Sequence, residues 1–376
     1  MRFLTLVTTL AAAAPLMAAA PPTNALFADG GSPIVFVGGK KTPLGELAGS
    51  LGDAVSEEAT RWAAAADSIG AGLHVVAGGQ VLLVTHSTKR KLKKELALIG
   101  DTLELVDELL PARPVATDEG ADQPSARRMP DPSDDGVLVL LQPKNDEEYG
   151  QLLEVVVEGE RYLQAWKESA RRLPGFTISR PAVAMWIELL DGQEEFDIRN
   201  ELVHRLAHLA IARRFGELPY WLQTGLSWHV EEELLGAIYC FPYRDEFVWA
   251  TEHTSWDKDL AREFKKTKGS DSYFAGLAAW KRGSYRRDEA RQAFGMARFL
   301  IEHHREDTPQ LLSNLYHLRA TKGVKSAGRG WELIPGWEPE AGDQRAEFER
   351  VLGEGILSEA AKSFAKGKRY KKPRKR

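Results

Sequence analysis

Two histidines, His204 and His208, stand four residues apart in the segment NELVHRLAHLA, residues 200–210. The surrounding apolar pattern predicts a helix from about Glu194 to Phe215 that ends at Gly216. Residues four apart lie on one face of a helix, so both imidazoles can converge on a single metal ion. A catalytic zinc site needs three protein ligands and an open fourth position, so this helix alone supplies an incomplete set.

The residue next to the first histidine has the wrong chemistry for a zinc peptidase. In the motif His-Glu-x-x-His, the glutamate activates the zinc-bound water, but the corresponding residue here is Arg205. A guanidinium stays protonated and cannot accept a proton from water. Its charge also opposes a nearby dication. The segment therefore predicts no catalytic residue at this position.

The segments HRLAH and PYWLQTGLSWHVEE resemble the gluzincin-type, peptidase MA-like family of bacterial zinc metallopeptidases. Similarity in VLVLLQPKNDEEY, QAFGMARFLIEHH and FERVLGEGI extends the resemblance over about residues 72–367. It implies a zincin-like fold, with His204 and His208 as metal ligands, the general base at Arg205 and the third ligand at Thr224. Both acidic members of the family's site are therefore replaced, and threonine is a poor zinc ligand compared with carboxylate, imidazole or thiolate.

Two interpretations of the histidines remain open. Glu201, one turn before His204, or Glu231, about 10 Å beyond Thr224 along its helix, could replace the missing ligand. Alternatively, the histidines are neutral, hydrogen-bonded residues in a former cleft, and the incomplete ligand count favours this interpretation. The acidic run at residues 231–233 is itself typical of a solvated helix face.

Sequence periodicity predicts the elements that position this site. Short strands are expected in SPIVFVGG, LHVVAGG, VLLVT, GVLVLLQP and AVAMWIELL, with a hairpin turn at Gly78 and Gly79. An apolar stripe from Leu92 to Leu110 predicts a helix, whereas residues 112–136 have the composition of an exposed loop. From Glu194 onward the chain looks almost wholly helical. These features indicate an α+β fold, in which a small N-terminal sheet with helices precedes a mostly helical C-terminal part.

The chain divides into five predicted parts. The N-terminus places Arg2 before an apolar run and small residues, which is typical of a secretory signal peptide. The protein is therefore expected to be exported to the periplasm, the cell envelope or the medium. The predicted parts are the signal peptide (1–25), an N-terminal extension (26–71), a sheet-containing α/β part (72–193), a helical part with the zincin-like site (194–361) and a basic tail (362–376).

Composition limits the classes of function. The 376 residues are 43% hydrophobic, enough for a sizeable core, and the single cysteine, Cys240, excludes an intramolecular disulfide. The last fifteen residues carry nine lysines or arginines and no acid, whereas the net charge of the whole chain is −4. Such a tail is usually solvated, and the alternative is binding to an anionic surface such as an envelope polymer or lipid headgroup. Nucleic acid is not an expected partner after export.

Together these features favour a secreted, catalytically inactive metallopeptidase homologue that binds or scaffolds. A peptide or an envelope polymer is the expected occupant of its cleft, and no cofactor is expected beyond weakly bound zinc. One alternative is an active zinc metallopeptidase with a rearranged ligand set, and another is an envelope-associated structural protein whose basic tail is the functional element. No Gly-x-Ser-x-Gly, phosphate-binding glycine loop or paired-cysteine motif indicates a different chemistry.

Overall fold

A computed structural model describes much of the chain. The described residues are 34–37, 40–43, 46–47, 51–69, 72–111, 136–158, 160–187, 197–239, 255–283, 286–327, 330–334 and 336–367. All of them belong to one compact unit, Pro33–Arg376. The predicted signal peptide, Cys240 and nearly all of the predicted loop at 112–136 fall outside the described residues.

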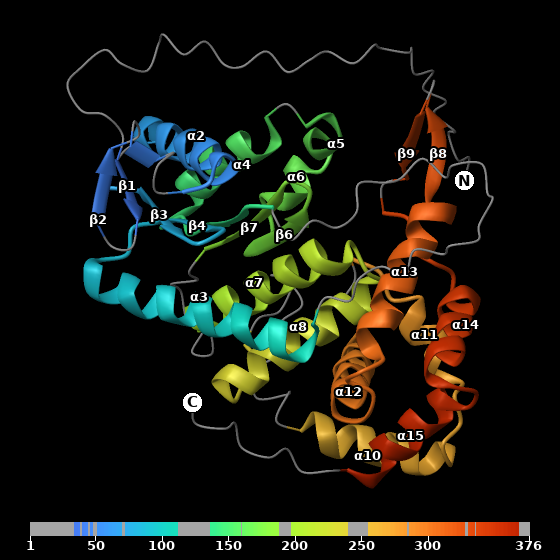
Figure 1. Ribbon diagram of the computed structural model, residues 1–376. Helices are drawn as coiled ribbons and strands as arrows, with labels where there is room; N and C mark the ends of the chain where they lie inside the picture. The colour runs from blue at the N-terminus through green and yellow to red at the C-terminus, as the bar shows by residue number, and fades with distance from the viewer. Residues whose placement is uncertain are drawn as a thin grey trace, which may run out of the picture. The chain divides into compact units, whose positions relative to one another are not determined.

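A mixed sheet of seven strands forms one half of this unit (Figure 1). In spatial order the strands are β2 (Lys40–Pro43), β1 (Ile34–Val37), β3 (His74–Gly78), β4 (Val81–Thr85), β5 (Leu138–Leu141), β7 (Ala182–Trp186) and β6 (Gly175–Ser179). The pairs β1–β3, β4–β5 and β5–β7 are parallel, and the other neighbours are antiparallel. The predicted hairpin is confirmed as β3–β4, where Gly79 adopts a φ of 62° that glycine tolerates.

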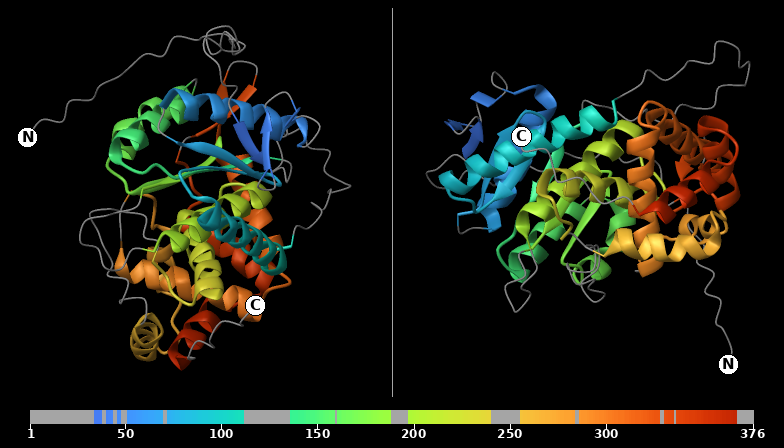
Figure 2. Two further views of the ribbon diagram at one scale, coloured as in Figure 1. Left: turned by 90° about the vertical axis from the view of Figure 1, so that its left-hand side faces the viewer. Right: turned by 90° about the horizontal axis from the view of Figure 1, so that it is seen from below.

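Helices cover both faces of the sheet (Figures 1 and 2). The helices of this half are α2 (Asp53–Ile69), α3 (Lys89–Leu109), α4 (Asp146–Val157), α5 (Arg161–Gln164) and α6 (Lys167–Ala170). Val75 and Leu82 share one apolar cluster with α2 and α4, whereas Val76 and Leu83 share the other with α3. Because successive strand residues point to opposite faces, burial of both faces explains why these strands are apolar throughout.

Helix α3 confirms the apolar stripe predicted from Leu92 to Leu110. Leu92, Ile99 and Val106 are buried on it, and the helix ends at Leu109, just before Pro111. Proline cannot continue a helix because it lacks the backbone N–H and its ring clashes with the preceding turn. The stripe therefore belongs to the core, as its spacing predicts.

The second half of the unit is mostly helical. Its helices are α7 (Ile198–Phe215), α8 (Tyr220–Leu235), α10 (Trp256–Thr267), α11 (Tyr273–Ala278), α12 (Arg287–His303), α13 (Thr308–Lys322), α14 (Ala341–Leu352) and α15 (Ile356–Lys366). The prediction of helix almost throughout is wrong at one place, because β8 (Val324–Ala327) and β9 (Gly330–Leu333) form an antiparallel hairpin. The segment VKSAGRGWEL carries two glycines between two short runs that begin and end with apolar residues, which is compatible with a hairpin but lacks a clear period of two. Strand β6 was also not predicted. The α+β class is confirmed.

Two predicted boundaries do not match the structure. Val35 of β1 pairs with Val75 of β3, so the predicted N-terminal extension contributes to the same sheet as the residues beyond Gly72. The predicted basic tail from residue 362 begins inside α15. Phe364 on that helix is buried and packs edge-on against Phe264, with ring centroids 5.0 Å apart. The structured chain therefore continues to Gly367, and residues 368–376 lie outside the described residues.

Candidate binding site at helix α7

Helix α7, which carries both histidines, is almost entirely buried. It contacts the sheet and α8, and every residue from Asn200 to Ala212 is buried. The Asp197 side chain caps its start by accepting a hydrogen bond from the Arg199 backbone N–H, 2.9 Å away. The helix ends at Gly216, as predicted, where a φ of 75° favours glycine. Each polar side chain on this helix must find a partner inside the protein, because an unpaired buried polar group is costly.

His204 finds its partner on α8. Its Nδ1 lies 3.1 Å from Oε2 of Glu231, which is fully buried. Burial, aided by the positive charge of Arg205, lowers the pKa of His204 to about 3, so the imidazole is neutral. The Glu231 carboxyl accepts at its other oxygen from Asn200 and Tyr239, so we assign it the role of acceptor here too, with the imidazole proton on Nδ1 and the lone pair on Nε2.

Glu231 is shared among several donors. Its Oε1 accepts hydrogen bonds from Asn200 Nδ2, at 2.7 Å, and from the backbone N–H of Tyr239. The prediction that residues 231–233 form a solvated face is therefore wrong, because Glu231 and Glu232 are both buried. The cause is that α8 packs against α7 and α12 and exposes little of its surface. Glu231 thus lies behind His204 as a hydrogen-bond acceptor.

Arg205, which follows His204 directly on α7, is paired with Glu201. Arg205 Nε donates to Glu201 Oε2 at 2.7 Å, and each side chain is only 4% exposed. A Cβ added at Gly175 on β6 would lie 2.6 Å from Arg205 Nη2 and 2.5 Å from the carbonyl oxygen of Met185. Because glycine has no side chain, the guanidinium of Arg205 can lie against the sheet at position 175.

His208, one turn further along α7, faces a cavity of about 250 Å³. The cavity is lined by Ser179, His208, Glu217, Leu218, Tyr220, Gln223, Lys281, Arg282, Arg319, Gly336 and Glu338. Gln223 Nε2 donates to the backbone carbonyl of His208 at 2.9 Å. Burial, followed by the positive charge of Arg282 and with a smaller contribution from Arg205, lowers the pKa of His208 well below its ordinary value. This histidine is therefore also neutral.

The cavity wall carries charges of both signs. Arg319 and Glu217 form an ion pair, and Glu338 Oε1 accepts a hydrogen bond from the backbone N–H of Tyr220 at 3.2 Å. Burial raises the pKa of Glu338, although that hydrogen bond and nearby cations oppose the rise. Lys281 and Arg282 lie exposed. None of these charged residues was identified from the sequence, because they come from separate segments that no short motif connects.

The framework around Thr224 holds helices together. Thr224 is 2% exposed, and a Cβ added at the next residue, Gly225, would lie 2.5 Å from the backbone oxygen of Ala293 on α12. Trp221 Nε1 donates to Gln344 Oε1 on α14 at 2.8 Å. Gly225 and Trp221 therefore have clear packing roles: the glycine permits close contact between α8 and α12, and the tryptophan ties α8 to α14.

The residues at α7 and α8 do not match a catalytic zinc ligand set. Among the described residues, no group of three or more His, Cys, Asp or Glu is arranged to hold a metal ion. Both acids that could have substituted are otherwise engaged, Glu201 with Arg205 and Glu231 with His204. Thr224 offers only a hydroxyl. His204 and His208 thus remain two of the three protein ligands that such a site requires.

A further buried pair lies on α8 beyond the site. Burial lowers the pKa of His229 to about 3, with a contribution from the charge of Arg298. Burial raises the pKa of Glu232 to about 8, although Arg298 opposes this change. Both side chains are therefore predominantly neutral near pH 7.

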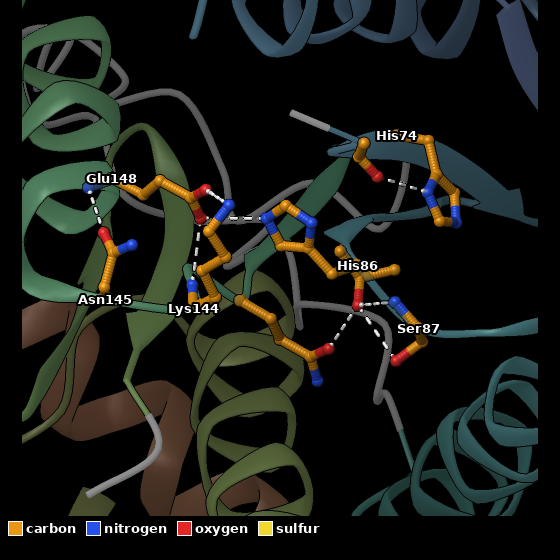
Figure 3. Close-up of polar contacts among 9 residues, drawn as sticks. His74, His86, Ser87, Lys144, Asn145 and Glu148 are labelled. Atoms are coloured by element: carbon orange, nitrogen blue, oxygen red, sulfur yellow. Dashed lines mark hydrogen bonds and ion pairs between the residues drawn. The ribbon is translucent and has the colours of Figure 1, made fainter. Parts of the chain in front are cut away.

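A separate polar cluster lies at the carboxyl ends of β4 and β5 (Figure 3). His86 Nε2 lies 2.8 Å from Glu148 Oε2, and Lys144 Nζ lies 2.9 Å from Glu148 Oε1. Asn145 caps α4 by accepting a hydrogen bond from the Glu148 backbone N–H at 2.9 Å. The cluster therefore ties the loop after each strand to the start of α4.

No known family model matches the chain, and no curated protein sequence is detectably similar to it. Among the helices that the structure describes, none is both long enough and apolar enough to cross a membrane.

Proposed function

We propose that the protein is an exported, zincin-like metallopeptidase homologue that binds a peptide or an envelope polymer without cleaving it. The observation that carries this proposal is the buried ion pair between Arg205 and Glu201, which occupies the position of the family's catalytic glutamate. A general base must accept a proton, and a guanidinium cannot. The resemblance in sequence supports the fold, and the chemistry of this pair supports the loss of catalysis.

The surroundings of Arg205 support a structural role. Its Nη1 makes a long contact of 3.5 Å with Thr177 Oγ1 on β6, in addition to the shorter bond to Glu201. Gly175 leaves room for the guanidinium. The arginine therefore has both a carboxylate partner and enough space in the core. This fit argues against a recent substitution in an otherwise functional active site.

The cavity beside His208 supports a binding role. It opens next to the histidine that would have held the metal, and polar and charged side chains line it. A concave site with a few converging polar groups is the usual form of a ligand site. Binding therefore needs no residue beyond those already present, whereas hydrolysis needs both a proton acceptor and a third metal ligand.

Calorimetric zinc titration beside a quenched-peptide assay tests this proposal. The natural chain should bind zinc weakly at most and show no chelator-sensitive cleavage. Thr224→Glu should gain zinc affinity, while the uncharged control Thr224→Gln should not. Adding Glu201→Gln and Arg205→Glu to Thr224→Glu supplies the proton acceptor without placing two buried carboxylates side by side. Tight stoichiometric zinc with chelator-sensitive cleavage by the natural chain would overturn the proposal.

An active zinc peptidase with a rearranged ligand set is the second candidate. It is favoured by Glu231, because a carboxylate that accepts from Nδ1 of a histidine orients Nε2 toward a metal. If this function is correct, Glu231→Gln should weaken zinc binding by about 10- to 100-fold. If the binding function is correct, Glu231→Gln should change protein stability and leave the weak zinc affinity unchanged.

Export is part of the proposal and has its own test. N-terminal sequencing of the protein from its native host should find a mature end between Ala20 and Leu26, because the preceding segment has the layout of a signal peptide. An intact Met1 in a cytosolic fraction would contradict export.

Binding of an anionic surface by the C-terminal residues is tested separately. Residues 368–376 contain seven lysines or arginines. Their removal should weaken binding to vesicles that contain anionic lipid, and the difference should shrink as salt is added. Equal binding of both forms would show that this segment makes no such contact.

A further inference from the structure

The cavity beside His208 has the size and position of a small ligand site. Its volume of about 250 Å³ falls just below the range of sites for drug-sized ligands, so it suits one or two amino-acid residues better than a long polymer. The floor comes from α7 and the first turn of α8, through His208, Tyr220 and Gln223. The N-terminus of the 16-residue α8 adds a positive partial charge on this side.

His208 is a buried polar group directed into this cavity. It is only 7% exposed, and its imidazole makes no hydrogen bond within the described part of the chain. A neutral imidazole offers one donor and one acceptor. A buried side chain of this kind calls for a partner, and the cavity that it lines is the place where a ligand can supply one.

The charges on the wall favour an anionic ligand. Arg319 is neutralised by Glu217, whereas Lys281 and Arg282 have no ion-pair partner among the described residues. Both lie exposed where they line the cavity, so a ligand can reach them from solvent. A carboxylate placed between these two cations would gain charge-assisted hydrogen bonds, and an arginine guanidinium can bind a carboxylate through two of them.

Glu338 adds a second requirement. Its Oε1 accepts from the Tyr220 backbone, while its Oε2 has no hydrogen-bond partner among the described residues. A simple anion without a hydrogen-bond donor, such as sulfate, would satisfy the two cations and leave this acceptor unmatched. A ligand that carries a carboxylate and, close to it, an N–H donor matches both groups.

We propose that this cavity binds the C-terminal residue of a peptide, with its free α-carboxylate at Lys281 and Arg282 and its amide N–H directed to Glu338. The backbone of a C-terminal residue carries a carboxylate and an N–H within one residue, which fits the arrangement of charges. Capture of a terminal carboxylate is a recurring mode of peptide recognition. This inference rests on the proposed function, because it assigns the ligand class of the same binding site.

N-acetyl dipeptides ending in Ala, Leu, Phe or Lys, each as free acid and as C-terminal amide, are the probes. Binding to the full chain is followed through the imidazole NMR signals of histidine-labelled protein, with the His208 signal assigned by His208→Gln. At least one free acid should shift the His208 signal, and its amide should bind about tenfold more weakly or worse. Added salt should weaken the acid's binding, since two exposed cations contribute to it.

Matched variants locate the carboxylate. Lys281→Gln with Arg282→Gln should reduce the affinity of the acid to that of the amide. Lys265→Gln with Lys266→Gln removes the same charge from exposed positions on α10 and should leave the affinity unchanged. Equal binding of acid and amide, or no binding of any probe, overturns the C-terminal assignment. The zinc and cleavage assays report on the proposed function independently, so the two failures are distinguishable.

Discussion

Two histidine–glutamate pairs in the molecule have similar geometry and different surroundings. His204 and Glu231 lie 3.1 Å apart with side chains only 6% and 0% exposed, whereas His86 and Glu148 lie 2.8 Å apart with 23% and 7% exposed. The first pair is enclosed between α7 and α8. The second lies at the ends of strands, beside a lysine that is 46% exposed (Figure 3).

The two pairs differ in what surrounds their titratable groups. Burial acts to raise the pKa of Glu148, but hydrogen bonds from the Lys144 backbone and side chain and from His86 outweigh it, so the pKa is lowered. For His204, burial and the nearby Arg205 dominate, and the histidine stays neutral. Water can therefore compensate for a lost partner in the strand-end cluster, while the α7–α8 site depends entirely on its internal partners.

The largest expected contrast comes from reversing one charge in each region. Arg205→Glu places two carboxylates in the core, so unfolding in urea should show a loss of about 3–5 kcal/mol or more. Lys144→Glu also makes a like-charge pair, with Glu148, but the side chain at 144 is 46% exposed and can turn into solvent, so the cost should be only about 1 kcal/mol.

The control for this prediction replaces the whole buried pair. Glu201→Leu with Arg205→Met removes both charges and should be far less destabilising than Arg205→Glu alone, because no buried charge is left without a partner. Equal stability of Arg205→Glu and the natural chain would show that the pair is not buried as described.

A smaller contrast is expected when each glutamate is truncated. Glu231→Ala leaves the buried side chains of Asn200 and His204 and the partly buried backbone N–H of Tyr239 without this acceptor and should cost about 3–5 kcal/mol. Glu148→Ala should cost about 1–2 kcal/mol, since Lys144 and His86 can be hydrated instead. Urea denaturation of both variants measures the difference, and similar losses would remove the distinction between the two regions.

The smallest contrast is in the pH dependence of stability. The unfolded His204 takes up a proton below about pH 6.5, while the folded one does so only near pH 3. The free energy of unfolding therefore falls as pH drops through this window, by about 1.4 kcal/mol per pH unit for this histidine. His229 adds a similar slope, and Glu232, with its pKa raised to about 8, opposes it by losing stability as pH rises above 4.5.

His204→Gln should flatten the slope between pH 4 and 6 by about one proton, as measured by urea unfolding at each pH. His86→Gln serves as the matched change in the strand-end cluster and should alter this slope less. If the two variants gave the same change, burial would not be what separates the pairs.

Local sequence patterns predicted the helices of this site but not the contacts between residues distant in the chain. The end of α7 at Gly216 and the shared face of His204 and His208 follow from helix periodicity. Glu231 was expected in solvent because an isolated acidic run usually is, and only packing of α8 against α7 places it behind His204. The cavity could not be predicted for the same reason, because two of its lining residues, Arg282 and Glu338, are more than 50 residues apart in the chain.

Gly175 and the buried pair above it restrict the order in which mutations could place a proton acceptor at position 205. The guanidinium of Arg205 fills the space above this glycine, and Glu201 is its counter-charge. A first step to glutamate at 205 would pass through a protein with two adjacent buried carboxylates and an empty volume over the sheet. A first step at 201 that removes the acid leaves a single buried guanidinium, which also costs stability. Either first step is unfavourable alone, so placing a glutamate at position 205 is an epistatic problem that involves both positions together.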